Sequence, residues 1–299
     1  MEQLLAGRAR TVEEFGALAR SVFVPEEVGA ALANWSPRPS DVLISPYSKC
    51  GTTWLQQIVH TLRTRGDMDF DDISAVVPWL ETATLLGIDL NAEQKANPRA
   101  YKSHLPYEAI PHGPKSICSL REPKDTLVSM YHFMEGWFIE PGSISLGDFA
   151  RDWMKRVERG SDIWRHLLSW WEQRKNPQVL LLTYEGMSAN PERTILRVAD
   201  FIGIELDEAL LSLTLQRSSL GFMLSHKDKF AEPLMRRATE VRCGLPLESD
   251  AAKVRQGGSG SGVTELPNDV VVQLDELWDR LVQLVTGLRD YAALEVTLR

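Results

Sequence analysis

The sequence contains few cysteines, no long apolar run and no apolar leading segment. Only 3 of its 299 residues are cysteine, Cys50, Cys118 and Cys243, and this odd number in a large chain predicts free thiols in a reducing compartment, not a disulfide framework. No stretch approaches the roughly 18 to 20 consecutive apolar residues that span a bilayer, and the first residues lack the apolar run of a signal peptide. We therefore expect a cytoplasmic protein without a membrane span.

Basic residues are also too few for a dedicated nucleic-acid binder. Lys and Arg together number 33 and Asp and Glu 41, which gives a net charge of −8 with histidine neutral. Nucleic-acid binding usually needs a basic domain or stripe that displaces phosphate counterions, so we expect no nucleic-acid partner. With 43% hydrophobic and 25% charged residues the chain has a globular composition, and any anionic ligand must be bound by a few local cations.

Strand-like and helix-like segments alternate along the chain. Short apolar runs beside turn residues predict strands at 41–45, 99–103, 115–121 and 178–184. Apolar residues at helical spacing predict helices at 54–62, 125–133 and 163–171, and a long helix at 270–285 that packs on the sheet. Together with a helical N-terminal segment at 1–36, this order predicts the α/β class: one domain of residues 1–299, with a central parallel sheet flanked by helices.

The segment from Ser48 to Trp54 joins the first predicted strand to the first long helix. A strand that ends in a glycine turn and opens a helix presents backbone N–H groups and the positive helix end to an anion. A nucleotide triphosphatase carries G-x-x-x-x-G-K-[ST], but here Thr52 follows Gly51 and Lys49 comes two residues before that glycine. The loop alone leaves two interpretations open: a phosphate site without the Walker lysine and its Mg²⁺, or a simple turn beside a surface lysine.

Several segments, in sequence order, resemble the motifs of the cytosolic sulfotransferases, which bind the sulfuryl donor PAPS (3′-phosphoadenosine 5′-phosphosulfate). They are Ser45-Pro-Tyr-Ser-Lys-Cys-Gly-Thr-Thr-Trp54, Tyr101-Lys-Ser-His-Leu-Pro106, Arg121-Glu-Pro-Lys-Asp-Thr-Leu-Val-Ser-Met-Tyr-His-Phe133, Trp170-Trp-Glu172, Leu182-Thr-Tyr-Glu-Gly-Met187 and Val254-Arg-Gln-Gly-Gly258. The resemblance extends from about Pro37 to the C-terminus. It implies the P-loop NTPase-like fold of that family and a PAPS-dependent transferase of the EC 2.8.2 type.

The resemblance also implies which residues carry out the transfer. Sulfuryl transfer needs a base for the acceptor's proton and a cation for the charge on the bridging oxygen. His104 is the implied base and Lys49 the implied cation beside the leaving phosphate. Lys102 lies two residues before His104, on the same side of a strand, where it adds positive charge, and Ser129 completes the catalytic set. No metal is required. An ordinary histidine and a surface lysine are the alternatives for His104 and Lys102.

The donor and its product PAP are expected to contact several segments. By resemblance, Arg121 and Ser129 hold the 3′-phosphate, Trp54 stacks on the adenine and Tyr184 hydrogen-bonds to it, although a tryptophan in this position is often part of the core. The other implied contacts are Lys49, Cys50, Gly51, Thr52 and Thr53 in the loop, then Ser218, Leu220 and Met223, and late in the chain Val254, Arg255, Gln256 and Gly257. Residues 253–265 are expected to be a mobile loop that binds the 3′-phosphate, with a flexible linker as the alternative.

The chain departs from the family pattern at four of these positions. Ser48 and Cys50 stand where the family has proline and serine, Leu220 stands near its adenine-stacking phenylalanine, and Gln256 replaces a lysine. The last change predicts weaker donor affinity. The short dimerisation motif of the animal enzymes is absent, so the resemblance implies no oligomeric state.

The acceptor is expected to be a small, largely apolar molecule with a hydroxyl group: an alcohol, a phenol or a lipid. Segments that line the acceptor pocket in relatives contain aromatic residues here, namely Trp79, Trp137, Phe138 and Phe230, although each could equally be core. The negative net charge disfavours a polyanionic acceptor.

Two other functions compete with a sulfotransferase. A P-loop nucleotide kinase or NTPase-like protein is disfavoured by the missing G-K-[ST] and by the Arg121 and Ser129 pair. A non-catalytic module that only binds PAP is disfavoured because Lys49 and His104 are both present.

Overall fold

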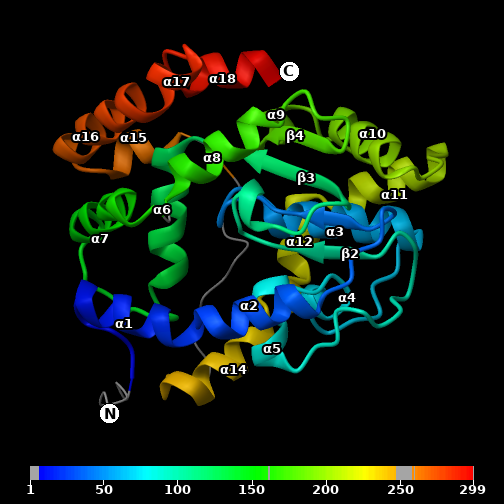
Figure 1. Ribbon diagram of the computed structural model, residues 1–299, viewed down its shortest axis with the longest axis horizontal. Coiled ribbons are helices and arrows are strands. Elements are labelled where there is room, and N and C mark those ends of the chain that lie inside the picture. The colour runs from blue at the N-terminus through cyan, green and yellow to red at the C-terminus, as the bar shows by residue number, and fades with distance from the viewer. Residues whose placement is uncertain (1–6, 161, 247–257, 259, 299) are drawn as a thin grey trace.

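Four short strands form a parallel sheet in the computed structural model, which describes residues 7–160, 162–246, 258 and 260–298 (Figure 1). The strands are β1 (Val42–Ile44), β2 (Ala100–Lys102), β3 (Lys115–Leu120) and β4 (Val179–Thr183), and they pair in the order β2-β1-β3-β4. All four predicted strands are confirmed, each one or two residues shorter than the apolar run that predicted it. The α/β class with a parallel sheet is therefore confirmed.

Helices cover both faces of this sheet. Along β1, Val42 and Ile44 belong to one apolar cluster and Leu43 to another, because successive side chains of a strand point to opposite faces. The first face is covered by α3 (Thr52–Thr64) and α10 (Pro191–Ile202), and the second by α6 (Pro123–Met134), α7 (Leu146–Met154) and α8 (Ile163–Glu172). The predicted helices at 54–62, 125–133 and 163–171 are confirmed and supply part of both layers, together with two helices that were not predicted, α7 and α10.

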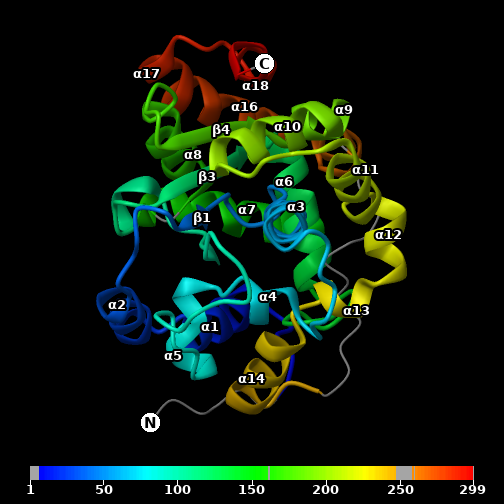
Figure 2. The ribbon, with the colours of Figure 1, turned by 90° about the vertical axis from the view of Figure 1, so that its right-hand side faces the viewer.

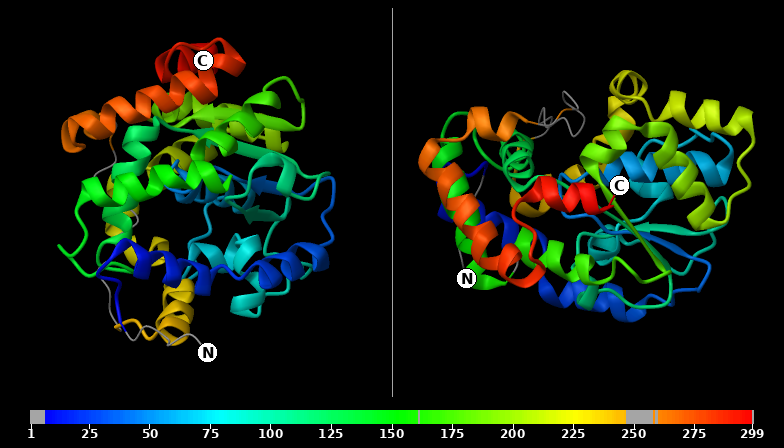
Figure 3. Two further views of the ribbon diagram at one scale, coloured as in Figure 1. Left: turned by 60° about the vertical axis from the view of Figure 1, so that its left-hand side comes forward. Right: turned by 90° about the horizontal axis from the view of Figure 1, so that it is seen from above.

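Two further groups of helices lie at opposite ends of the molecule (Figure 1, Figure 2 and Figure 3). At one end are α1 (Val12–Val22), α2 (Pro25–Asn34), α5 (Ala83–Leu86) and α14 (Pro233–Cys243), and at the other α16 (Asn268–Trp278), α17 (Leu284–Thr286) and α18 (Tyr291–Leu298). The remaining helices are α4 (Ile73–Val76), α9 (Tyr184–Ala189), α11 (Glu208–Arg217), α12 (Leu220–Ser225), α13 (Lys227–Phe230) and α15 (Ser261–Glu265), with 3-10 turns at Leu80–Thr82, Tyr107–Ala109 and Lys155–Arg159. In the described part of the chain, none of these helices has the length and apolar character that crossing a bilayer requires.

The long helix predicted at 270–285 is interrupted. A π-helical turn at Asp279–Gln283 separates α16 from α17, and such a turn inserts extra residues that rotate the buried face. Leu274 is buried as predicted, but Val285 is 64% exposed and Val282 is buried in its place. The prediction that this helix packs on the sheet is wrong, because α16 packs mainly against α6 and α7, whereas α18 contacts β4.

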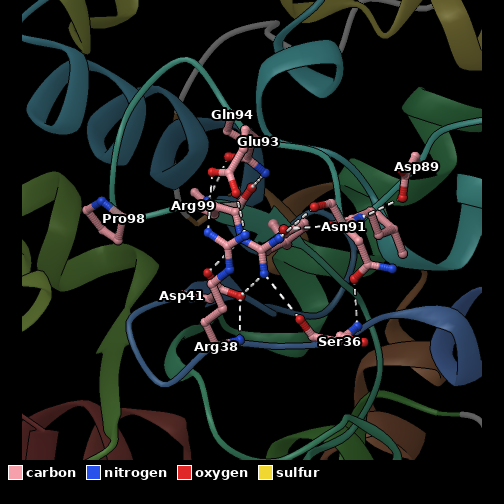
Figure 4. Close-up of polar contacts among 12 residues, drawn as sticks. Ser36, Arg38, Asp41, Asp89, Asn91, Glu93, Gln94, Pro98 and Arg99 are labelled. Atoms are coloured by element: carbon pink, nitrogen blue, oxygen red, sulfur yellow. Dashed lines mark hydrogen bonds and ion pairs between the residues drawn. The ribbon is translucent and has the colours of Figure 1, made fainter.

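A buried ion pair joins the amino ends of β1 and β2 (Figure 4). Arg99 donates from Nε and Nη2 to the two carboxylate oxygens of Asp41 at 3.0 and 2.6 Å, and neither side chain is more than 1% exposed. The backbone N–H of Arg38 donates to the same carboxylate at 2.7 Å. This network aligns the two strands at the sheet edge opposite to their carboxyl ends, so it supports a site at those ends without belonging to it.

The buried histidine of α8 is expected to make the fold acid-sensitive. His166 is 3% exposed, its Nε2 donates to the Ser45 carbonyl directly after β1 at 3.2 Å, and burial lowers its pKa to about 3. The unfolded chain binds a proton near pH 6.5 that the folded chain does not bind, so stability is lost as the pH falls below about 6.5. Between about pH 7 and pH 4.5 this group alone should lower the free energy of unfolding by about 2–3 kcal/mol.

Urea unfolding of the wild type and of His166→Gln at these two pH values measures this contribution. The variant should lose less stability than the wild type over this interval, because glutamine binds no proton. An equal loss in both proteins would contradict the prediction.

Candidate functional site

Each of the four strands leads at its carboxyl end into a residue that the sequence singled out. The loop with Lys49 follows β1, His104 follows β2, Arg121 follows β3 directly, and Tyr184 follows β4 directly. Because all four strands are parallel, these ends meet at one edge of the sheet. The strand order reverses between β1 and β3, and ligands of open α/β sheets bind at such a switch point.

A cavity of about 870 Å³ lies at this edge and brings most of the predicted residues together. The predicted residues in its wall are Lys49, Gly51, Thr52, Thr53, Trp54, Trp79, Lys102, His104, Arg121, Ser129, Trp137, Phe138, Tyr184, Ser218, Leu220 and Met223. They come from segments spread over much of the chain, and the fold brings these segments together around one cavity.

Two predicted residues do not line the cavity. Cys50 is 1% exposed, its Sγ lies 3.5 Å from the hydroxyl of Thr126, and burial raises its pKa to about 12. Phe230 is fully buried against Phe70 in the core beneath the cavity wall, with the ring centroids 6.5 Å apart. The predicted late residues Val254, Arg255, Gln256 and Gly257, with most of the predicted 253–265 loop, lie outside the described residues.

The loop after β1 has the geometry of an anion site. Lys49 and Gly51 both adopt left-handed backbone conformations, with φ of 70° and 94°, and Gly51 caps the start of α3 without a side-chain hydrogen bond to the helix. A Cβ atom at Gly51 would stand 3.1 Å from the Tyr184 ring and its residue would have to adopt a φ of 94°, so a larger residue there would be strained and would displace that ring. The hydroxyl of Thr52 is buried and has no hydrogen-bond partner among the described residues. A phosphate against the helix start would satisfy both this hydroxyl and the first N–H groups of α3.

Arg121 connects this loop to the glycine-rich segment late in the chain. Its guanidinium donates to the carbonyl oxygens of Lys49 and Gly258 at 2.8 and 2.7 Å. The same group lies 4.2 Å from the centroid of the Tyr184 ring, which stands edge-on to Trp54 at 5.9 Å. Burial raises the pKa of Tyr184, the nearby Arg121 charge opposing it, so its hydroxyl stays a donor at neutral pH. The residues predicted to bind the adenine and the 3′-phosphate therefore adjoin one another.

Asp125 is a site residue that the sequence reasoning left out. Its two carboxylate oxygens accept the backbone N–H groups of Gly260 and Gly262 at 2.6 and 2.7 Å. A Cβ atom at Gly262 would come within 2.5 Å of the α6 backbone, so only glycine allows this approach. Asp125 and Ser129 both line the cavity from one face of α6. Asp125 belongs to the Arg121 motif, which could have indicated a role in the site. An acidic residue in the first turn of a helix is also common at a solvent-exposed surface, so the motif alone did not single it out.

The surroundings of His104 fix its orientation and its tautomer. Its Nδ1 lies 2.8 Å from the Pro46 carbonyl oxygen, which can only accept, so Nδ1 carries the proton and the lone pair of the neutral ring is on Nε2. Its backbone N–H donates to Glu81 at 2.6 Å, and its ring stands edge-on to Trp79 at 5.0 Å. Glu81 also lines the cavity, and burial raises the pKa of its carboxyl group. Nothing in the sequence reasoning pointed to Glu81.

The two predicted catalytic lysines sit over aromatic rings in the cavity wall. The Lys49 ammonium lies 4.0 Å from the centroid of Phe133, and the Lys102 ammonium 3.9 Å from that of Trp79. Lys102 forms an ion pair with Glu232 and is 1% exposed, so it is not the surface lysine of the alternative interpretation. Lys102 and His104 reach the same Trp79 ring, as their spacing along the strand predicts.

Apolar side chains form much of the cavity wall. Besides Trp54, Leu220 and Met223 they are Phe23, Val28, Trp79, Leu105, Phe133, Met134, Trp137, Phe138 and Met235. Trp137 packs on Phe133 and Phe138, with ring centroids 5.1 and 4.7 Å apart. Phe23 and Val28 come from the N-terminal helices and Met235 from α14, which the sequence reasoning did not connect to the site. Within the described ranges, no cluster of three or more His, Cys, Asp or Glu side chains could hold a metal ion.

Comparison with known proteins gives a consistent result. Residues 39–286 match the family model described as the sulfotransferase domain. Sulfotransferase 1E1 of Bos taurus is 33% identical over 197 residues, which cover 62% of this chain and 66% of the bovine protein, so this match spans just under two thirds of that relative. Sulfotransferase 1C2 of Rattus norvegicus is 27% identical over 292 residues, covering 90% of this chain and 95% of the rat protein.

Solved structures share the fold. Retinol dehydratase in a complex with retinol and PAP matches with a TM-score of 0.68 and 19% identity, covering 92% of this chain and 96% of that one. Mouse sulfotransferase SULT7A1 complexed with PAP matches with a TM-score of 0.65 and 20% identity, covering 88% and 91%. At these identities the likeness shows a common architecture.

Proposed function

Since the chain belongs to the sulfotransferase domain family and is a PAPS-dependent sulfotransferase, we propose that it transfers the sulfuryl group of PAPS to the hydroxyl group of a small, largely apolar alcohol, phenol or lipid. One observation carries this proposal. A single cavity is lined by the cations Lys49 and Arg121, by His104 and by a set of apolar side chains. A donor bound by the cations and an acceptor packed on the apolar side chains would share this cavity with the histidine.

His104 is proposed as the general base. Because its Nδ1–H is directed to the Pro46 carbonyl, Nε2 is the atom that takes the proton of the acceptor hydroxyl. The acceptor oxygen then forms a new bond to sulfur, while the bond between sulfur and the bridging phosphate oxygen breaks and PAP leaves with that bond's electron pair. The charges balance, since the base gains the proton and the leaving phosphate gains the negative charge.

Lys49 is proposed to meet the charge that develops on the bridging oxygen, and Lys102 to add positive charge on the acceptor side. Lys49 precedes the start of α3 by three residues, so its ammonium and the helix end act on the same phosphate. The hydroxyls of Thr52 and Thr53 would bind the 5′-phosphate. No metal is needed for these roles.

Arg121 and Ser129 are proposed to bind the 3′-phosphate, and Trp54 and Tyr184 the adenine. The stack of Arg121 on Tyr184 beside Trp54 supports this division. Buried polar atoms without a partner in the described chain fit a ligand here, among them Nε of Arg121, Nε1 of Trp54 and the hydroxyl of Thr52. Leu220, 40% exposed at the start of α12, would cover one face of the purine.

The apolar wall supports an apolar acceptor. Two solved structures that share the fold contain retinol and androsterone, both apolar molecules with one hydroxyl group. A site with this wall would bind such a molecule mainly by burial of apolar surface and would orient its hydroxyl toward His104.

Isothermal titration with PAP, ATP and ATP with Mg²⁺, followed by transfer assays with labelled PAPS and a panel of phenols and alcohols, tests the proposal. We expect PAP to bind at least about 100-fold more tightly than ATP with Mg²⁺, because only PAP carries a 3′-phosphate. Tight binding of ATP–Mg²⁺ without PAP binding would favour the kinase-like alternative. PAP binding without transfer to any member of the panel would favour a non-catalytic PAP-binding module.

A cytoplasmic location and a single domain of residues 1–299 stay predictions. The three cysteines, Cys50, Cys118 and Cys243, are free and buried, which agrees with a reducing compartment.

A further inference from the structure

The wall of the cavity contains a fully buried ion pair. The carboxylate of Glu232 contacts the Lys102 ammonium, each side chain is 1% exposed, and both residues line the cavity. Burying two charges costs more free energy than an apolar pair of the same size would, so such a pair is poor evidence for a purely stabilising role. Its position in the cavity wall suggests a role in the reaction.

The backbone of Glu232 is strained where the pair forms. Glu232 has φ 51° and ψ 57°, a left-handed conformation that is uncommon for any residue other than glycine. It also precedes Pro233, whose ring favours an extended conformation in the residue before it. Strain of this kind persists only where the surroundings impose it, and it gathers at functional sites.

The surroundings of Glu232 do impose it. Phe230, fully buried, anchors the chain before it, and Met235, 2% exposed, anchors the first turn of α14 after it. The hydroxyl of Ser74 donates to the same carboxylate oxygen that contacts Lys102, at 3.4 Å. The carboxylate is thus directed at Lys102 from a fixed backbone.

Lys102 is fixed equally well from the strand side. Its backbone N–H donates to the Pro78 carbonyl at 2.7 Å, which pairs the segment before Trp79 with the end of β2. This pairing lays the Trp79 ring under the ammonium and beside the His104 ring. Lys102 and His104 therefore contact one indole, and Glu232 reaches it through Lys102.

We propose that Glu232 is a positioning residue for sulfuryl transfer: it holds the Lys102 ammonium on the Trp79 ring, in line with the reacting centre beside His104. The inference rests on the proposed function, because it assigns Lys102 to that reaction. A carboxylate is needed since a buried ammonium without a counter-charge is costly and would turn toward solvent.

A double-mutant cycle tests this role with four proteins: wild type, Glu232→Gln, Lys102→Met and the double variant. The assay uses labelled PAPS and the phenol or alcohol that the wild type converts fastest. In Glu232→Gln we expect kcat to fall at least about tenfold, with the KM for PAPS and the Kd for PAP changed by less than about twofold. In the Lys102→Met background the same substitution should change kcat by less than about twofold, because the group through which Glu232 acts is absent.

A role confined to folding predicts a different pattern. It would lower the yield and the melting temperature but leave kcat per folded molecule unchanged. Full kcat in Glu232→Gln, or an equal fall of kcat in both backgrounds, would overturn the proposal. Glu240→Gln is the matched control, since Glu240 is also a buried acid of α14 but lies outside the cavity wall, and it should keep kcat within about twofold.

If Glu232→Gln does not fold, Glu232→Asp takes its place. Aspartate tolerates the left-handed backbone better but carries its carboxylate one methylene group further from Lys102. We expect at least about a threefold fall in kcat with unchanged PAP binding, and full kcat would overturn the proposal. A wild type without any PAPS-dependent transfer would instead refute the proposed function, so the two failures are distinguishable.

Discussion

Replacing His104 with alanine is expected to lower kcat for sulfuryl transfer by about 10²–10⁴-fold, because the acceptor hydroxyl loses the base that takes its proton. The affinity for PAP should change by less than about twofold, since the substitution leaves Lys49, Arg121 and the start of α3 in place. Labelled-PAPS kinetics give the first quantity and titration with PAP the second. The separation of the two effects is the diagnostic feature, because misfolding would remove both.

His112→Ala serves as the control for this prediction. His112 is exposed and does not line the cavity in the described part of the chain, so its loss should leave kcat within about twofold. If His104→Ala keeps its turnover, another group must accept the proton, and Glu81, which accepts the His104 backbone N–H and also lines the cavity, is the candidate. A comparable loss of PAP affinity would indicate that the hydrogen bond from His104 to Pro46 mainly supports the phosphate loop.

The sheet was predictable from the sequence for a physical reason. Parallel strands buried on both faces are short continuous apolar runs, and all four runs were recognised. The C-terminal helix shows the limit of this reasoning. A π-helical turn at Asp279–Gln283 changes the residue that faces inward, and helical periodicity cannot reveal where such a turn occurs.

The site was predictable in so far as its residues belong to contiguous motifs. Lys49, His104 and Arg121 each follow a strand, so motif and topology lead to the same edge of the sheet. Glu81 and Glu232 belong to no motif that was recognised. Their link to the site is visible only in the fold, which brings Glu81 to His104 and Glu232 to Lys102. Phe230 was predicted to line the acceptor pocket on the basis of its segment. The structure buries it completely in the core, and it does not line the cavity.

The net charge of −8 contrasts with the cations Lys49 and Arg121 in the cavity wall. A protein with an excess of acid binds a donor that is itself strongly anionic, so its affinity must come from a few placed groups. In the described part of the chain, the groups that we propose for this task are Lys49, Arg121, the Thr52 hydroxyl and the start of α3. The carboxylates of the same cavity are directed elsewhere: Asp125 binds backbone N–H groups, and Glu232 binds Lys102.

Arg121→Ala is expected to weaken PAP binding by about 100-fold, because it removes the guanidinium that we propose to bind the 3′-phosphate through charge-assisted hydrogen bonds. AMP lacks the 3′-phosphate, so its affinity should fall by less than about threefold. Titration of wild type and variant with both nucleotides gives the ratio of the two losses. Arg121→Lys should fall between wild type and alanine for PAP, because lysine keeps the charge but not the planar fork.

The ratio of the PAP loss to the AMP loss is needed because Arg121 also links two loops. It donates hydrogen bonds to the Lys49 and Gly258 carbonyls. Loosening of these loops would weaken PAP and AMP alike, whereas loss of a phosphate contact weakens PAP alone. Arg174→Ala is the matched control, since Arg174 also lies over an aromatic ring, 4.7 Å from Trp171, but does not line the cavity. Equal losses for the two nucleotides in Arg121→Ala would therefore assign Arg121 to loop support, and the 3′-phosphate would require a different cation.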